Sequence, residues 1–300
     1  MPSLVHRSSH RILAAFAATG LLLLLNGGTT VQAQPAPAAA AKPTLWLIGD
    51  STVNNNANGG LGWGMPAAID KLFDPAKITI KNQARGGRSA RSYYSEGLWD
   101  AIKPQLKPGD FVLMQFGTND GGDPKGANSK GRPDLPGIGE ETTTGIASVG
   151  GKEETVHTFG WYMKAYVDDT KAKGATPIML TMVPHDRWVA GKVGRDTDTF
   201  VKWSRQIAEN GGAYYINLND VTAMRLEKST EAEVTAKYFT PPGDRTHTNP
   251  AGAALNAESV VMGIRALKDL KLNDMLSDAG KALVAADAED VEIPKPAAKP

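Results

Sequence analysis

A serine near the beginning of the chain and an aspartate–histidine pair near its end have the residue types of a nucleophilic catalyst. Ser51 follows the apolar run Leu45–Gly49, and Asp244 precedes His247 by three positions in Asp-Arg-Thr-His. On a loop, this spacing lets the carboxylate accept a hydrogen bond from one imidazole nitrogen while the other nitrogen faces the serine hydroxyl. Each piece also has a plainer interpretation, because Gly-Asp-Ser suits a turn or a helix cap and the aspartate–histidine pair suits a solvated loop.

Two further segments could stabilise the negative charge that such chemistry develops on an oxygen. Asn119 follows the apolar run Phe111–Phe116, where its amide could donate to an oxyanion. Gly87 follows the run Ile78–Asn82 and permits close backbone approach, so its N–H, like that of Ser51, could donate as well. The competing interpretations are a turn at Asn-Asp-Gly-Gly and a strand-to-helix connection that needs glycine.

The other histidines have no matched carboxylate. His6 and His10 lie in the N-terminal leader, and we interpret His157 as structural, at the start of a helix. His185 lies beside Asp186, and its position favours a solvated loop histidine, with a substrate contact as the alternative.

Several other chemistries have no sequence signal. No His/Asp/Glu cluster has metal-ligand spacing, and no glycine-rich phosphate loop follows the first apolar run, so we expect neither a metal nor a cofactor. The Gly-x-Ser-x-Gly elbow of α/β-hydrolases is absent. The chain has no cysteine, which excludes a thiol nucleophile and disulfide bonds.

Five short apolar runs predict buried strands, and helical patterns separate them. Nearly continuous apolar runs are typical of parallel strands covered on both faces. We therefore predict a three-layer α/β/α sandwich around a five-stranded parallel sheet, in which ligands bind outside the carboxyl ends of the strands. The predicted strands are Leu45–Gly49, Ile78–Asn82, Phe111–Phe116, Pro177–Val183 and Tyr214–Leu218.

Two helices have the clearest apolar stripes. One is predicted over 155–173 and the other over 250–270, with Asn249 as its cap and Pro250 in its first turn. Residues 121–152 form a long loop beside Asn119, which we expect to shape a substrate groove unless it is a simple insertion.

The N-terminal leader has the pattern of a secretory signal peptide. Arg7 and Arg11 precede the apolar run Ile12–Leu25, and small residues end at Ala33, where we expect cleavage. A membrane anchor is the alternative, but the run is short for a spanning helix. We expect residues 1–33 to be the signal peptide, 34–43 a linker, 44–284 one hydrolase domain and 285–300 a disordered tail, in a secreted or periplasmic protein.

The net charge provides no electrostatic reason for a polyanionic partner. The full chain of 300 residues carries +1 and loses two cations with the leader. We therefore expect no nucleic-acid partner, no membrane association after cleavage, and a monomer.

The segments that carry Ser51, Gly87, Asn119 and the Asp244–His247 pair follow one another in this order along the chain. In this order they resemble the four motifs of the SGNH (GDSL-type) hydrolase superfamily. The glycine-rich 59–64 segment and the runs GGRSARSY, FGTNDGG and DRTHTNPAGA resemble more closely the rhamnogalacturonan acetylesterase branch, over about 45–270. The resemblance implies a flavodoxin-like fold. It also implies Ser51 as nucleophile, His247 as base and Asp244 as its orienting residue, with an oxyanion hole formed by Ser51, Gly87 and Asn119.

The implied activity is the removal of acetyl groups from a pectic polysaccharide without a cofactor. Arg85, Arg88 and Arg91 could favour galacturonate by pairing with its carboxylate, or they could be solvated or packed. The alternatives are a xylan acetylesterase, a lipase-like acyl hydrolase and a non-catalytic carbohydrate-binding protein.

Overall fold

The central sheet lies between two layers of helices because its strands carry apolar side chains on both faces. The computed structural model describes residues 42–126, 129–239 and 243–291, and its sheet has the order β2-β1-β3-β6-β9 with every neighbouring pair parallel. The predicted three-layer fold with a five-stranded parallel sheet is confirmed. The strands are β1 Thr44–Gly49, β2 Thr79–Asn82, β3 Phe111–Gln115, β6 Thr176–Leu180 and β9 Tyr214–Ile216.

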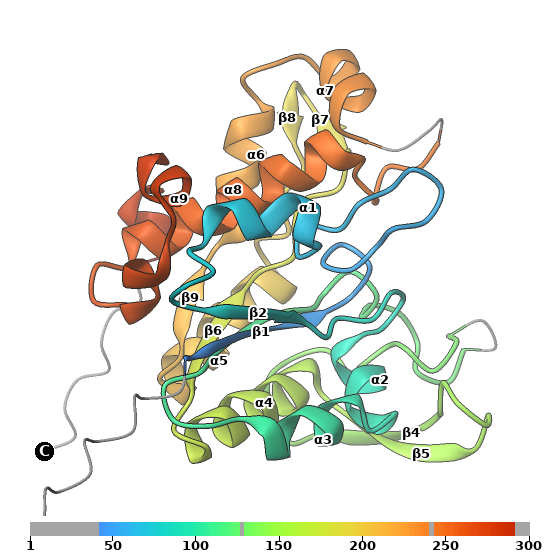
Figure 1. Cartoon of the computed structure of the whole chain (residues 1–300). Coiled ribbons are helices and arrows are strands. Elements are labelled where there is room, and N and C mark those ends of the chain that lie inside the picture. Colours follow the sequence, from blue (N-terminus) through green and yellow to red (C-terminus); the bar gives the residue numbers. More distant parts are fainter. Residues whose placement is uncertain (1–41, 127–128, 240–242, 292–300) are drawn as a thin grey trace, which may run out of the picture. The chain divides into compact units, whose positions relative to one another are not determined.

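Alternate residues of β1 enter two separate cores. Leu45 and Leu47 pack in the core that includes residues of α1 and α8, whereas Trp46 and Ile48 pack in the core of α2 to α5. Figure 1 shows these helices on opposite faces of the sheet. They are α1 Pro66–Ile69, α2 Ala90–Ser95, α3 Leu98–Ile102, α4 Phe159–Ala172, α5 Phe200–Gly211 and α8 Pro250–Ala266.

The remaining elements surround these layers. Two antiparallel hairpins pair β4 with β5 and β7 with β8. The other elements are β4 Thr142–Ile146, β5 Glu153–His157, β7 Trp188–Val189, β8 Lys192–Val193, α6 Leu218–Leu226, α7 Glu231–Tyr238, α9 Asp278–Ala282 and the 3₁₀ turns η1 Asp70–Leu72, η2 Lys103–Gln105, η3 Lys271–Met275 and η4 Ala288–Asp290.

Some predicted boundaries are wrong for local reasons. The helix expected from residue 155 begins at Phe159, because Thr155 and His157 pair with β4 and the Thr158 hydroxyl caps the helix. The end of the chain is ordered beyond residue 284, up to Val291, which is buried. The predicted signal peptide and nearly all of the linker lie outside the described residues.

The cap of the last long helix agrees with the prediction. Asn249 accepts hydrogen bonds from the backbone N–H groups of Ala251 and Gly252, and Pro250 opens α8. The helix ends at Ala266 and not at residue 270.

The strand order places the loops after β1, β2 and β3 next to one another. The chain runs from β1 outward to β2 and then returns to the other side of β1 for β3. Such a reversal opens a crevice at the carboxyl ends of the strands. Ser51, Gly87 and Asn119 follow these three neighbouring strands.

Candidate active site

Ser51, His247 and Asp244 lie in one hydrogen-bonded line. The Oγ of Ser51 is 2.8 Å from Nε2 of His247, although the two residues are 196 positions apart in the chain. The Nδ1 of the same imidazole is 2.8 Å from Oδ2 of Asp244. The structure therefore brings together the three residues that the sequence singled out, in the order in which a serine hydrolase would use them.

Asp244 holds both the ring of His247 and the backbone of its own loop. Its Oδ1 accepts hydrogen bonds from the N–H groups of Thr246 and His247, each at 2.9 Å. Burial acts to raise the pKa of Asp244, but these hydrogen bonds and that of the His247 ring outweigh it and leave the pKa below its usual value. The carboxylate thus stays ionised and can orient the imidazole.

A buried polar network supports the turn that carries Ser51. The N–H and the hydroxyl of Thr52 both donate to Oδ1 of Asp50 at 2.7 Å. Gln115, the last residue of β3, donates to the Thr52 hydroxyl and accepts from the indole N–H of Trp63. The turn after β1 is therefore fixed to its neighbouring strand.

The glycine-rich 59–64 segment joins the serine turn to the histidine loop. On one side, the Trp63 N–H donates to the carbonyl oxygen of Thr52 at 3.0 Å. On the other side, the Leu61 N–H donates to the carbonyl of Thr248, and the Thr248 hydroxyl donates back to the Leu61 carbonyl. At Gly62 a Cβ atom would lie 2.5 Å from the carbonyl carbon of Val53, so only glycine allows this approach.

The predicted oxyanion donors Ser51, Gly87 and Asn119 follow three neighbouring strands of the sheet. Among the described residues, none accepts a hydrogen bond from the backbone N–H of Ser51 or of Gly87. The side-chain Nδ2 of Asn119 donates one hydrogen bond to the Arg88 carbonyl at 3.1 Å, which leaves its second N–H for another acceptor. A Cβ atom built at Gly86 would lie 3.6 Å from Cβ of Ser51, so the loop after β2 approaches the serine closely.

The three arginines after β2 do not form the cationic cluster that the sequence suggested. Arg91 is fully buried and binds Glu154 together with the carbonyl oxygens of Pro133 and Ile146. Arg88 donates through Nε and Nη2 to one carboxylate oxygen of Glu96. Of the three, only Arg85 is exposed. Arg91 therefore has a structural role, because its contacts hold the β4–β5 region against α2.

The chain matches a known family over most of the residues that the structure describes. Residues 47–255 match the model of the GDSL-like lipase/acylhydrolase family. The chain belongs to this family. The hydrolase is therefore an enzyme that acts on carboxylic esters, and the matched residues include all five positions of the predicted site.

Among its relatives, the hydrolase is similar to a rhamnogalacturonan acetylesterase of Emericella nidulans, with 35% identity over 80% of this chain and 91% of that protein. It is 28% identical to the probable rhamnogalacturonan acetylesterase YesY of Bacillus subtilis, over 74% of this chain and 93% of the other. The solved structure of YxiM from Bacillus subtilis superposes with a TM-score of 0.60 at 25% identity, over 76% of this chain and 57% of that chain.

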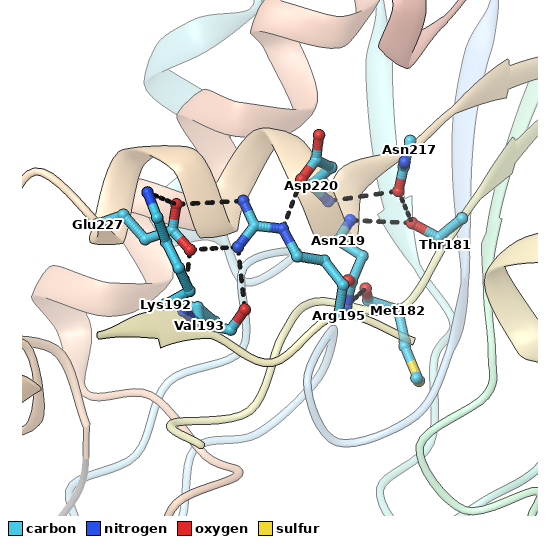
Figure 2. Close-up of polar contacts among 9 residues, drawn as sticks. All are labelled: Thr181, Met182, Lys192, Val193, Arg195, Asn217, Asn219, Asp220 and Glu227. Carbon is cyan, nitrogen blue, oxygen red and sulfur yellow. Dashed lines mark hydrogen bonds and ion pairs between the residues drawn. The ribbon is translucent and has the colours of Figure 1, made fainter. Parts of the chain in front are cut away.

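Figure 2 shows how the hydrolase fastens the segment between β6 and α5 to helix α6. Arg195 donates to Asp220 and to Glu227, and Glu227 also accepts from the Val193 N–H at 2.8 Å. At the start of the segment, the Thr181 hydroxyl accepts from the Asn219 N–H. These contacts fix both ends of the stretch that packs against the histidine loop.

His185 lies in that stretch, close to the proposed base. The N–H of its neighbour Asp186 donates to the Arg245 carbonyl at 2.8 Å, and Arg245 donates back to the Asp186 carbonyl at 3.0 Å. The imidazole of His185 is half-buried, so the interpretation as a solvated loop histidine is wrong. Burial, and then Arg187 and His247, lower the pKa of His185, which keeps its ring neutral near pH 7.

The loop after Asn119 is held to the hydrolase core by two buried carboxyl groups. Asp120 accepts from the N–H groups of Ala90 and Gly117, and burial raises the pKa of Asp120 to about 7. Burial, and then the charge of Asp120, raise the pKa of Asp134 well above its usual value. The pair therefore keeps a proton at a pH at which an exposed pair of carboxyl groups would be fully ionised.

This pair predicts a pH dependence of stability. The folded state binds more protons than the unfolded state between the ordinary aspartate pKa and the raised values, so the free energy of unfolding should fall as pH rises from about 4 to about 7. Asp134→Asn removes one of the two carboxyl groups with a raised pKa and should flatten part of this decline. Urea denaturation midpoints of the wild type and the variant at several pH values test this prediction. If the midpoints of both proteins fall equally with pH, the prediction is contradicted.

No helix in the ranges given above has both the length and the apolar character needed to cross a membrane. Within the same ranges, no group of three or more His, Cys, Asp or Glu side chains is arranged to hold a metal ion.

Sequence reasoning missed two parts of this site. The pairing of Leu61 with Thr248 carried no signal beyond the glycine-rich composition of its segment. Arg132 lies beside Asn119, inside the loop that was expected only to shape a groove.

Proposed function

We propose that the protein is a serine esterase that removes acetyl groups from a polysaccharide of the rhamnogalacturonan type. The observation that carries the proposal is the unbroken line from Asp244 through His247 to Ser51, with both hydrogen bonds at 2.8 Å. The names of the relatives supply the substrate class, since one is called a rhamnogalacturonan acetylesterase and another a probable rhamnogalacturonan acetylesterase.

In the proposed reaction, Ser51 Oγ attacks the carbonyl carbon of an acetyl ester and Nε2 of His247 takes its proton. Asp244 stabilises the imidazolium that forms. The N–H groups of Ser51 and Gly87 and the amide of Asn119 receive the negative charge on the tetrahedral intermediate. His247 then protonates the departing sugar oxygen, and a water molecule that His247 deprotonates releases acetate from the acyl-enzyme.

Acetate release from a panel of acetylated polysaccharides tests this function. We expect release from acetylated rhamnogalacturonan to exceed release from acetylated xylan. A clear preference for xylan would favour the xylan acetylesterase instead, and a preference for long-chain nitrophenyl esters would favour a lipase. Hydrolysis of none of these substrates would contradict the proposed function.

We also propose that the protein is exported and monomeric. The leader before Ala33 and the enzyme's polymeric substrate both favour a secreted or periplasmic location. N-terminal sequencing of the mature protein should begin at Gln34, and an intact leader would contradict export. A molecular mass near that of one chain in light scattering would support the monomer.

Replacing the side-chain oxyanion donor should lower turnover more than binding. For Asn119→Ala we expect kcat for nitrophenyl acetate to fall about 10²- to 10³-fold with little change in KM, because the lost hydrogen bond forms mainly in the transition state. Steady-state kinetics measure both constants. The matched control is Asn210→Ala, at an exposed position of α5, which should retain full activity. A fall confined to KM would contradict the assigned role.

A further inference from the structure

Arg132 lies between two of the predicted oxyanion donors. Its Nη1 is 3.5 Å from Oδ1 of Asn119, and a Cβ atom at Gly87 would lie 2.8 Å from its Nη2. The loop after β2, which carries Gly87, approaches Ser51 through Gly86. A guanidinium group is therefore fixed next to the position where the acyl group must sit.

A tight turn determines where Arg132 lies. Its N–H donates to the carbonyl of Ser129 at 3.1 Å, and the two residues between them, Lys130 and Gly131, have φ values of 53° and 63°. These values belong to a turn of type I′. A Cβ atom at Gly131 would lie 2.1 Å from the backbone nitrogen of Ser148, so the turn packs directly against that segment. On the other side, the Pro133 carbonyl is held by buried Arg91.

The charge of Arg132 is not compensated as the charges of its neighbours are. Arg88 and Arg91 each pair with a glutamate, whereas no described carboxylate lies within ion-pair distance of Arg132. The side chain is half-buried, so the cation is partly removed from water yet reachable. A guanidinium in this setting can bind a carboxylate through two parallel hydrogen bonds.

Arg132 also lines a cavity beside Asn119. The cavity has a volume of about 520 Å³, within the usual range of about 300–1,000 Å³ for small-molecule sites. Asn119 lines it at the catalytic side, and Lys130 adds a second cation. One acid, the exposed Asp123, is also present, with one oxygen accepting from the Lys125 N–H at 2.9 Å. The charged side chains of the cavity therefore favour an anionic sugar over a neutral one.

We propose that Arg132 binds the carboxylate of a uronate residue at or beside the acetylated sugar, and so selects acidic polysaccharides as substrates. The inference rests on the proposed function and deepens it. The carboxylate contact that the sequence suggested for the arginines after β2 is thus assigned to Arg132 of the β3–β4 loop. Lys130 increases the attraction from the rim, where its exposed ammonium group is more strongly screened.

Arg132→Gln tests the inference on two matched oligosaccharides. Both are acetylated galacturonate oligomers, one with free carboxylates and the other with the carboxylates methyl-esterified. We expect the substitution to lower kcat/KM on the free-acid substrate about 10- to 100-fold, mainly through KM. Activity on the methyl-esterified substrate and on nitrophenyl acetate should change by less than about threefold, the spread expected for a contact that neither substrate uses. Arg132→Lys should restore part of the loss.

The control is Arg205→Gln, which removes an arginine of α5 that pairs with Glu209 and should leave all three activities unchanged. An equal fall of kcat on all three substrates with Arg132→Gln would overturn the inference, because Arg132 would then act through Asn119. Equal KM values for the free-acid substrate in wild type and variant would overturn it as well.

Inhibition separates this inference from the proposed function. Unacetylated oligogalacturonate should inhibit nitrophenyl acetate hydrolysis competitively in the wild type, and at least tenfold more weakly in Arg132→Gln, the lower end of the expected loss for one charged hydrogen bond. That result would support the carboxylate site even if the enzyme released no acetate from pectic polymers. Inhibition of equal strength in both proteins would overturn it even if acetate release were normal.

Discussion

Ser51→Ala is expected to lower kcat for acetyl-ester hydrolysis on the order of 10⁶-fold, the loss seen when a serine hydrolase keeps its oxyanion hole but has no nucleophile. The hydroxyl is 2.8 Å from Nε2 of His247, within hydrogen-bonding distance of the base that would take its proton. Because the substitution removes only one oxygen from a half-buried site, the fold should persist.

Acetate release and nitrophenyl acetate hydrolysis by purified proteins measure the effect, with circular dichroism to verify folding. Ser95→Ala is the matched control, since Ser95 is an exposed residue at the end of α2. Mass spectrometry after rapid quenching should detect an acetyl adduct on the wild type and none on Ser51→Ala. Substantial activity in Ser51→Ala would refute the assigned nucleophile.

Asp244→Asn should lower kcat by about 10⁴-fold while leaving the loop in place. The asparagine Oδ1 can still accept from the N–H groups of Thr246 and His247, which Asp244 holds at 2.9 Å. Its amide group, however, would donate to Nδ1 of the imidazole. That bond favours the tautomer with the proton on Nε2, which cannot accept the proton of Ser51.

The pH–rate profile distinguishes this effect from a general loss of structure. Asp244→Asn should keep the thermal stability of its loop but lose most activity across the neutral range. Asp168→Asn, in an exposed ion pair with Lys164 on α4, is the matched control and should match the wild type in kcat. A loss of only a few fold in Asp244→Asn would mean that His247 is oriented by another group.

The fold could be predicted from the sequence because each strand is a short apolar run with polar residues at its end. Leu45 to Ile48 is apolar throughout, and the structure confirms that these side chains fill two cores, one on each face. For a parallel sheet of this kind, the strand ends also predict where Ser51 and Asn119 lie. The start of the helix at Phe159 could not be predicted, because Thr155 and His157 pair with β4. The polar sequence of residues 142–146 gives little indication of a strand there.

The contacts of the arginines could not be predicted because they depend on tertiary structure. Arg91 looks like a surface cation in GGRSARSY, yet the fold brings to it Glu154 of β5, the Ile146 carbonyl of β4 and the Pro133 carbonyl of the β3–β4 loop. No sequence pattern predicted a role for Arg132, because its position depends on the turn at Lys130 and Gly131. Spacing along a chain predicts which residues share a helix face or a strand end, but not which carboxylate meets a given cation.

The separation of Ser51 and His247 along the chain has a consequence for how the enzyme becomes active. The proposed nucleophile follows the first strand of the sheet, whereas its base precedes the last long helix, 196 positions later. A chain still being synthesised therefore holds a serine with no partner and cannot turn over an ester. Two fragments, one with Ser51 and the other with His247, would likewise be inactive when separate, and their mixture would regain hydrolysis only on reassembly. The rate at which activity appears would therefore report the rate at which folding is completed.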